Sequence, residues 1–210
     1  MPAARVSVVV RCRDKASTIE HTLRALRAQS VPVEVVVVDS GSTDGTVERA
    51  APLADVLVQV PSADFTYGGA LNAGAAAAST AVHAACSAHT VPRPDFAERV
   101  LAHLSDPGIA AASGALLSPA GELLTEPYLQ RRGDLEVAPW WGFSNTLSAW
   151  RAEVWADQRF REGLSACEDK EWSWRVLRLG HAIIIDPALL PLNEHRRAEG
   201  VVRNWQRVHT

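Results

Sequence analysis

Hydrophobic positions near the start of the chain form short valine-rich runs separated by a segment with helical spacing. The runs at 6–10 and 33–39 are apolar at almost every position, which is typical of strands buried on both faces. Between them, residues 16–30 place isoleucine and leucine three or four positions apart, which predicts an amphipathic helix capped by Ser17 or Thr18. Two buried strands joined through a helix predict a parallel βαβ unit with a right-handed crossover.

The same alternation of strand and helix patterns continues along the chain. The further elements that we predict are a helix over 42–54, a strand over 56–60, an alanine-rich helix over 68–80, a strand over 82–86, a helix over 95–106, a strand over 109–118, a helix over 167–180 and a strand over 182–186. Residues 118–140 contain three prolines and two glycines and are expected to be irregular. The pattern predicts an α/β domain with a Rossmann-like, mostly parallel central sheet and helices on both faces.

Composition narrows the class of protein without identifying it. Of the 210 residues, 47% are hydrophobic and 21% are charged, as in ordinary globular domains. The formal net charge is -3, so we expect no nucleic-acid partner. The first apolar run is too short for a signal peptide and no later run approaches a membrane span, so we expect a cytoplasmic protein without a transmembrane segment. The three cysteines form no C-x-x-C pair and predict neither disulfides nor a zinc site.

Polar clusters follow the predicted strands of the first half of the chain. They are RCRD at 11–14, DSGSTDGT at 39–46, DFTYGGALN at 64–72 and SAH at 87–89. In open parallel sheets, ligands bind beyond the carboxyl ends of the strands. The four clusters therefore predict one composite binding site at this edge of the sheet.

The cluster at 39–46 carries the strongest signal of the four. Asp39 ends a run of valines, so its carboxylate needs a polar partner, and a nucleoside N–H or a ribose hydroxyl would serve. The two glycines of the cluster allow tight turns. For Ser42, Thr43 and Asp44, an ordinary turn that caps the next helix and a contact with a ligand fit the sequence equally well.

Six segments of the chain, taken in order, resemble one protein family. They are VSVVVRCRD, VEVVVVDSGSTDGT, FTYGGALNAGAAAAS, SAHTVPRPDF, FSNTLSAWRAEVW and CEDKEWSWRVLRLGHAIIIDP. Together they resemble family 2 glycosyltransferases of the GT-A fold, and the later segments resemble a rhamnosyltransferase-like subset with SAH in place of the DxD motif. No break in composition marks a linker, so we expect a single domain over 1–210, and the resemblance implies a nucleotide-binding half at about 1–90 and an acceptor and catalytic half at about 91–210.

The resemblance implies a site for a nucleoside-diphosphate sugar as donor, with uridine or thymidine as the expected base. It assigns Arg11, Asp14 and Asp39 to nucleotide binding, with Asp44 in support. Family members often carry asparagine where this chain has Asp14, so this chain lacks the side-chain N–H that could donate a hydrogen bond to the base. Asn72 matches a recurrent asparagine and is implied to contact ribose or diphosphate, whereas a hydrogen bond at a helix terminus is the structural alternative.

The largest departure from the family lies at 87–89. Most members carry an acidic DxD-like signature there, which holds a divalent cation, whereas Ser87 and His89 occupy its ends in this chain. His89 is a candidate ligand for Mg²⁺ or Mn²⁺ together with His195, or a hydrogen-bond donor to the leaving diphosphate. Imidazole suits borderline metals better than these two cations, so both roles stay open.

CEDKEW at 167–172 resembles the acidic motif that supplies the catalytic base of the family. The resemblance implies that Asp169, with Glu168 beside it, removes the proton of the acceptor hydroxyl. Direct attack by the acceptor implies inversion at the anomeric carbon. Without the resemblance, the expected role of this segment is an acidic helix start paired with Lys170.

Trp140 and Trp141 are candidate contacts for the acceptor, because flat indole rings with an N–H donor bind sugars well. The same segment is alternatively a mobile lid over the donor. Four further tryptophans fall in or near helical patterns and are expected in the core: Trp150, Trp155, Trp172 and Trp174. We expect a small-molecule or glycan acceptor, and a compact domain rich in tryptophan is compatible with a homodimer.

Other classes of protein fit parts of the pattern. A nucleotidyltransferase of similar architecture would need a glycine-rich loop after the first strand, which RCRDKAST lacks. A non-catalytic or degenerate nucleotide-sugar-binding module fits the missing acidic signature, although Glu168 and Asp169 argue against it. A dehydrogenase is excluded because no GxGxxG follows the first strand.

Overall fold

The valine-rich runs at the start of the chain form neighbouring parallel strands, as predicted. In the computed structural model, which describes residues 5–193, β1 (Val6–Cys12) pairs along its whole length with β2 (Val33–Asp39). β3 (Val56–Gln59) lies beside β2 and β4 (Val82–Ser87) lies beside β1, both in the same direction. The carboxyl ends of these four strands therefore meet at one edge of the sheet.

The second half of the chain extends the same sheet, so that the described residues form one mixed α/β domain. The strand order is β3-β2-β1-β4-β7-β5-β8-β6. The added strands are β5 (Ile109–Ser113), β6 (Tyr128–Gln130), β7 (Leu147–Arg151) and β8 (Ala182–Ile185). Among the described strands, β6 and β7 run against the others. The prediction of a mostly parallel sheet is confirmed.

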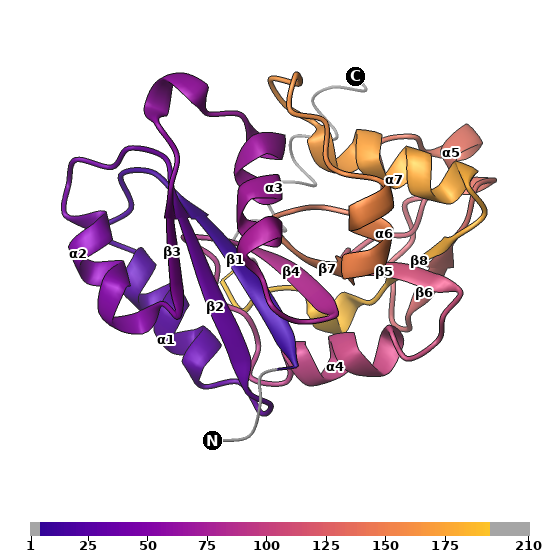
Figure 1. The fold of residues 1–210 in the computed structure, drawn as a ribbon. Coiled ribbons are helices and arrows are strands. Elements are labelled where there is room, and N and C mark those ends of the chain that lie inside the picture. The colour runs from indigo at the N-terminus through magenta and orange to yellow at the C-terminus, as the bar shows by residue number, and fades with distance from the viewer. Residues whose placement is uncertain (1–4, 194–210) are drawn as a thin grey trace, which may run out of the picture.

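Helices cover both faces of the sheet, as predicted (Figure 1). They are α1 (Ile19–Arg27), α2 (Thr46–Ala50), α3 (Tyr67–Ala77), α4 (Phe96–His103), α5 (Asp134–Val137), α6 (Ala152–Asp157) and α7 (Glu168–Arg178), with 3-10 turns at Ala51–Leu53, Ser62–Asp64 and Pro187–Leu189. One buried cluster joins α1 and α4 to Val8 and its neighbours, and a second joins α3, α6 and α7 to Val9 and its neighbours. Alternate valines of a strand thus enter different layers, which explains why the runs are apolar throughout.

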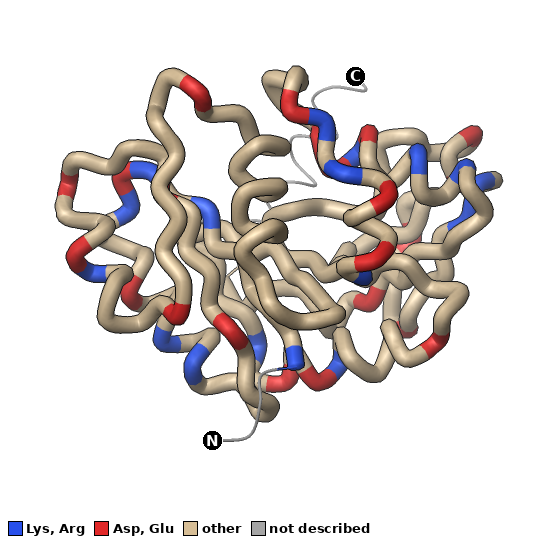
Figure 2. Tube along the Cα trace, viewed as in Figure 1, with Lys and Arg blue, Asp and Glu red and all other residues tan. Residues whose placement is uncertain are grey.

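The alanine-rich helix α3 lies unusually close to the sheet. A Cβ atom added at Gly74 would come within 2.3 Å of Val9 Cγ1 and 2.9 Å of Val38 Cγ2. Small residues are therefore needed on this face, as the composition of the segment predicts. None of the helices formed by residues 5–193 is long and apolar enough to cross a lipid bilayer. Positive and negative residues are interspersed along the described chain in the view of Figure 2.

Parts of the second half differ from the sequence prediction. Residues 118–140 are not wholly irregular, because they contain β6, which pairs with β8, and the short helix α5. Residues 147–157 form β7 and α6, for which no element is predicted above. The strand predicted over 109–118 ends at Ser113. The two strands among these elements, β6 and β7, form by pairing with strands that are distant in the sequence.

The predicted helix caps are also corrected by the structure. Thr18 is the N-cap residue of α1, as predicted, but its hydroxyl donates to Ala88 O (2.9 Å) instead of accepting from the helix. Gly45 is the N-cap residue of α2 and provides no side-chain hydrogen bond. The hydroxyl of Ser42 donates to Asp39 Oδ1 (2.5 Å), so Ser42 belongs to the turn after β2.

Candidate functional site

The predicted polar clusters meet at the carboxyl edge of the parallel strands. The register of β1 against β4 places Arg11 opposite Ser87. The main-chain N–H of Ser87 donates to Thr146 O (2.9 Å), which brings the residues before β7 to the same edge. Asn145 then contacts the start of α7 through its main-chain N–H, which donates to Asp169 Oδ2 (3.3 Å). The site therefore combines residues from both halves of the chain.

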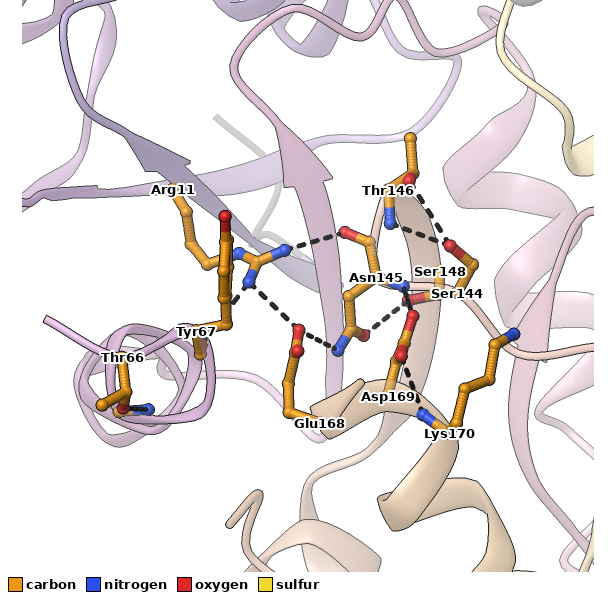
Figure 3. Close-up of polar contacts among 11 residues, drawn as sticks. Arg11, Thr66, Tyr67, Ser144, Asn145, Thr146, Ser148, Glu168, Asp169 and Lys170 are labelled. Atoms are coloured by element: carbon orange, nitrogen blue, oxygen red, sulfur yellow. Dashed lines mark hydrogen bonds and ion pairs between the residues drawn. The ribbon is translucent and has the colours of Figure 1, made fainter. Parts of the chain in front are cut away.

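Arg11 lies at the centre of this site (Figure 3). Its guanidinium donates to Glu168 Oε1 (3.3 Å), Asn145 O (3.3 Å) and Tyr67 O (3.5 Å), and it lies 5.5 Å from the centre of the Tyr67 ring. The side chain is 13% exposed, and burial lowers the pKa of Arg11 while Glu168 opposes that effect. One cation thus joins β1 to the beginnings of α3, β7 and α7.

The two carboxylates at the start of α7 have different surroundings. The side chain of Glu168 is 7% exposed, and its Oε1 accepts from Arg11 and from Asn145 Nδ2 (3.4 Å). Asp169 is half-buried, and besides Asn145 N it accepts from the main-chain N–H of Lys170 (2.8 Å) through Oδ1. Glu168 is therefore the partner of a buried cation, whereas Asp169 retains access to the surface of the site.

Asp39 finds its polar partners within its own turn. It is 2% exposed, and its Oδ2 accepts from the main-chain N–H groups of Gly41 and Ser42, both at 3.1 Å. Its Oδ1 accepts from the hydroxyl of Ser42 and from the thiol of Cys12 (3.7 Å). Because the chain itself supplies the partners that this buried carboxylate needs, Asp39 shapes the loop after β2, and its contact with a nucleoside stays a prediction from the family resemblance.

Asp14 and Asp44 link the loops that follow β1 and β2. Asp14 is exposed, has a φ of 50°, and accepts from Thr43 N (2.9 Å) through Oδ1. Asp44 accepts from Ala16 N (3.0 Å) through Oδ2 and from the hydroxyl of Thr46 through Oδ1. These hydrogen bonds, that of Thr46 first, lower the pKa of Asp44. The two loops form one interlocked surface, on which Asp14 and Asp44 are exposed.

The amide group of Asn72 is directed at α6 and the segment that follows it. It is 5% exposed, and its Nδ2 donates to Phe160 O and to Glu162 Oε1, both at 2.8 Å. Its Oδ1 accepts from Trp155 Nε1 (2.9 Å) and from Phe160 N (3.1 Å). The amide group therefore has no capacity left for ribose or diphosphate. Asn72 links α3 to the segment after α6, and the predicted nucleotide contact is corrected to this structural role.

His89 lies exposed in the turn that follows β4, at the predicted edge of the sheet. Its main-chain carbonyl accepts from Asn193 Nδ2 (2.6 Å). His195, the second predicted metal ligand, lies outside the described residues. Within residues 5–193, no group of three His, Cys, Asp or Glu side chains is placed to hold a metal ion. The described residues alone therefore do not fit a complete cation site.

The two tryptophans predicted to contact the acceptor differ in their surroundings. The indole N–H of Trp141 donates to Leu117 O (2.6 Å), and its ring packs edge-on against Tyr128. Trp140 is 62% exposed and lies 5.3 Å from Trp174, measured between ring centres. Trp174 is half-buried, so the prediction that it lies in the core is wrong. The same prediction is confirmed for Trp150, Trp155 and Trp172. Trp140 therefore presents an aromatic surface together with Trp174, and Trp141 does not.

Asn145 and Tyr67 belong to the site but are not singled out by the sequence. Asn145 is buried and contacts Arg11, Glu168 and Asp169. The strand β7 that follows it is antiparallel, so the start of that strand lies at the edge where the parallel strands end. Tyr67 lies inside the predicted cluster at 64–72, but the sequence assigns no specific role to its ring.

Comparison with known proteins identifies a family. The sequence pattern of the family described as glycosyl transferase family 2 matches residues 7–163. This segment includes Arg11, the cluster at 39–46 and Asn145, and it ends before Glu168. No curated protein matches the chain significantly.

Solved structures share the fold at low sequence identity. Mannosyltransferase PcManGT from Pyrobaculum calidifontis, in complex with GDP-Man and Mn2+, has a TM-score of 0.70 at 24% identity over 90% of this chain and 57% of that one. S. aureus TarS 1-349, in complex with UDP-GlcNAc, has a TM-score of 0.70 at 19% identity over 89% of this chain and 57% of that one.

A third structure shows the same relation. Glucosyl-3-phosphoglycerate synthase from Mycobacterium tuberculosis, in complex with phosphoglyceric acid, has a TM-score of 0.64 at 22% identity over 87% of this chain and 69% of that one. This chain spans less than two thirds of the length of PcManGT and of TarS 1-349. The family pattern covers most of the chain, and these structures share its fold. The chain therefore belongs to glycosyl transferase family 2 and has the GT-A fold.

Proposed function

We propose that this chain transfers a sugar from a nucleoside-diphosphate sugar to an acceptor hydroxyl, with inversion at the anomeric carbon and Asp169 as the general base. The observation that carries the proposal is the position of the half-buried Asp169 carboxylate beside the Arg11–Glu168 pair at the carboxyl edge of the sheet. Family membership supports glycosyl transfer, and the names of two structures with this fold include GDP-Man and UDP-GlcNAc.

Asp169 suits the role of base better than Glu168. Protonation of Glu168 would remove the charge that compensates buried Arg11, which is costly in a poorly solvated site. Each oxygen of Asp169 accepts one main-chain N–H among the described residues, and a carboxylate oxygen can accept a second hydrogen bond. As the acceptor oxygen bonds to the anomeric carbon and the bond to the diphosphate breaks, the hydroxyl proton passes to Asp169.

The donor is assigned to residues of about 1–90, and the acceptor to residues of about 91–210. The exposed loops carrying Asp14 and Asp44 would surround the nucleotide, which we expect to be a uridine or thymidine nucleotide. Arg11 and His89 belong to neighbouring strand ends and would face the departing diphosphate in this arrangement, where positive charge or a hydrogen-bond donor stabilises the leaving group. A divalent cation would use His89, for which His195 is the proposed second ligand.

The acceptor is proposed to stack on Trp140, whose ring packs against Trp174. Trp141 is not proposed as an acceptor contact, because its indole N–H is bonded to Leu117 O. The exposed ring of Trp140 suits the apolar face of a sugar or another small acceptor. A non-catalytic nucleotide-sugar-binding module is the second candidate function, favoured by Ser87 and His89 in place of an acidic signature.

Asp169→Asn tests the proposal, since it keeps the shape of the side chain and removes the base. With a panel of UDP-, dTDP- and GDP-linked sugars, we expect kcat to fall by about 100- to 10,000-fold while donor binding is retained. Asp157→Asn, on the exposed end of α6, is the matched control and should retain wild-type activity. Equal donor binding without turnover in either protein would favour the binding module. Retention of anomeric configuration, measured by NMR of the product, would contradict the proposed inversion.

A further inference from the structure

Residues 139–145, named here the strap, run along one face of α7 and carry two parts of the proposed site, Trp140 and Asn145. Hydrogen bonds hold the strap to α7 at three points: Trp174 Nε1 to Pro139 O (2.6 Å), Lys170 Nζ to Phe143 O (2.5 Å) and to Gly142 O (3.3 Å), and Asn145 N to Asp169 Oδ2 (3.3 Å). Residues 170 and 174 are one turn apart and so lie on the same face of the helix. The strap therefore runs antiparallel to α7, with its last residue at the proposed base.

The strap is confined on its other side by β6. Gly142 has a φ of 91°, and a Cβ atom added there would lie 2.4 Å from Gln130 Oε1. Gln130 is fully buried, and its Nε2 donates to Trp141 O (3.3 Å). The strap thus has little room to shift as long as its contacts with α7 are kept.

Lys170 provides the middle of the three attachments. It is the charged donor among them, and hydrogen bonds from a charged group are stronger than those between neutral groups. Burial lowers the pKa of Lys170, while the nearby Asp169 carboxylate opposes that effect. The ammonium group donates to the carbonyl oxygens of Gly142 and Phe143, and its removal would leave those two oxygens without this partner.

We propose that Lys170 is a positioning residue for Asp169. By holding the strap on α7, it keeps the N–H of Asn145 on the Asp169 carboxylate and keeps Trp140 at a fixed place relative to that carboxylate. Lys170 itself does not touch the reacting atoms. The inference rests on the proposed function, because it specifies how the base of that reaction is oriented.

Lys170→Met tests this inference, since methionine keeps an unbranched side chain and removes the three N–H donors. Misplacement of a catalytic group by about 1 Å costs up to about 100-fold in rate, so we expect kcat to fall by about 10- to 100-fold. Donor KM should stay within about twofold, because the donor loops are untouched. Amide hydrogen exchange of residues 142–145 should become faster.

Arg175→Met is the matched control on the same helix. Arg175 donates to Arg159 O (2.7 Å) and to Glu171, so it attaches α7 to the segment on its other side. We expect this variant to lower the melting temperature while kcat and the exchange of residues 142–145 stay near wild type.

The outcomes separate this inference from the proposed function. A Lys170→Met protein whose kcat stays within about twofold of wild type, or whose kcat falls no more than that of Arg175→Met, would overturn the inference. If the wild type turns over no donor, the proposed function fails, and hydrogen exchange alone then decides whether Lys170 holds the strap on α7. Unchanged protection of residues 142–145 in Lys170→Met would overturn its role in holding the strap.

Discussion

The parallel region formed by β1 to β4 and the region that follows it are stabilised in different ways. In the first, main-chain groups pair in continuous ladders, and valines on β1 and β2 fill the layers on either side. In the second, much of the chain between strands is irregular, and side chains from distant residues satisfy its carbonyl groups. Three indole N–H groups do this: Trp141 on Leu117 O, Trp172 on Gln158 O and Trp174 on Pro139 O.

The two regions differ in how strongly their local structure depends on a single residue. A valine in the first region shares its role with several neighbours, so the loss of one leaves the ladder intact. In the second region, a single donor often fixes a loop, and its loss leaves a carbonyl oxygen without its partner. Arg151 is a further example, since its guanidinium donates to Leu104 O (2.5 Å), Asp106 O (2.7 Å) and Ile109 O (2.8 Å). Substitutions should therefore be tolerated unequally in the two regions.

Trp172→Ala provides the largest test of this comparison. Trp172 is fully buried against Phe143 and Phe160, and its indole holds Gln158 O (2.5 Å). We expect the free energy of unfolding to fall by about 3–5 kcal/mol, measured by urea denaturation. Val9→Ala in the parallel region should cost about 2 kcal/mol. Equal losses in the two variants would remove the distinction between the regions.

Asn72→Ala tests the contact between α3 in the first region and the segment after α6 in the second. It removes four hydrogen bonds and leaves the N–H of Trp155 and both main-chain groups of Phe160 without this partner. We expect a loss of about 2–3 kcal/mol in the free energy of unfolding, with the donor KM unchanged. Unchanged stability with a raised donor KM would instead support the nucleotide contact that the family resemblance implies.

Trp141→Phe and Trp140→Ala separate a structural tryptophan from one proposed to contact the acceptor. Trp141→Phe keeps an aromatic ring against Tyr128 and removes the donor to Leu117 O, which should cost about 1–2 kcal/mol in stability without changing the acceptor KM. Trp140→Ala should change stability by about 0.5 kcal/mol or less and raise the acceptor KM. The reverse pattern in denaturation and kinetics would restore Trp141 as the acceptor contact.

His83 provides a pH-dependent test at the boundary between the regions. It is buried on β4 near Trp150 and Trp155, and burial lowers its pKa, although the main chain of Thr80 and the charge of Glu34 oppose that effect. The folded protein therefore favours the neutral imidazole. This stabilisation is present above the unfolded pKa of about 6.5 and is lost as the pH falls below it, because the unfolded chain then binds a proton first.

The expected loss is at most about 1.4 kcal/mol for each pH unit below that value, down to the folded pKa. Denaturation of the wild type and of His83→Gln between pH 7 and pH 5 measures the difference in slope. A glutamine variant that keeps the full pH dependence of the wild type would assign the effect to other groups.

The parallel region could be predicted from the sequence because its signals are local. The run over Val33–Asp39 matches β2 to the residue, since each valine is buried whichever face it enters. β7 could not be predicted in this way. Its five residues become a strand through antiparallel pairing with both β4 and β5, which lie about 35 to 70 positions earlier in the chain.

The candidate site was predicted unevenly for the same reason. The family resemblance directed attention to Arg11, Glu168 and Asp169, which lie together at one edge of the sheet. It misassigned Asn72, because the partner of a buried amide 88 residues away leaves no mark in a local motif. Asn145 was missed because its importance depends on the direction of β7.

The reversal of β7 also has a consequence for folding during synthesis. The chain must travel out to β6 and return before α7 can approach β1, so the contact between Arg11 and Glu168 closes a loop of 157 residues. Closing so long a loop is entropically unfavourable and belongs to the late stages of folding. A nascent chain that has not yet reached residue 168 holds an arginine at the end of β1 without its counter-charge. The edge of the sheet that carries Arg11 and Glu168 is therefore completed only when α7 docks, after β1 to β4 have been synthesised.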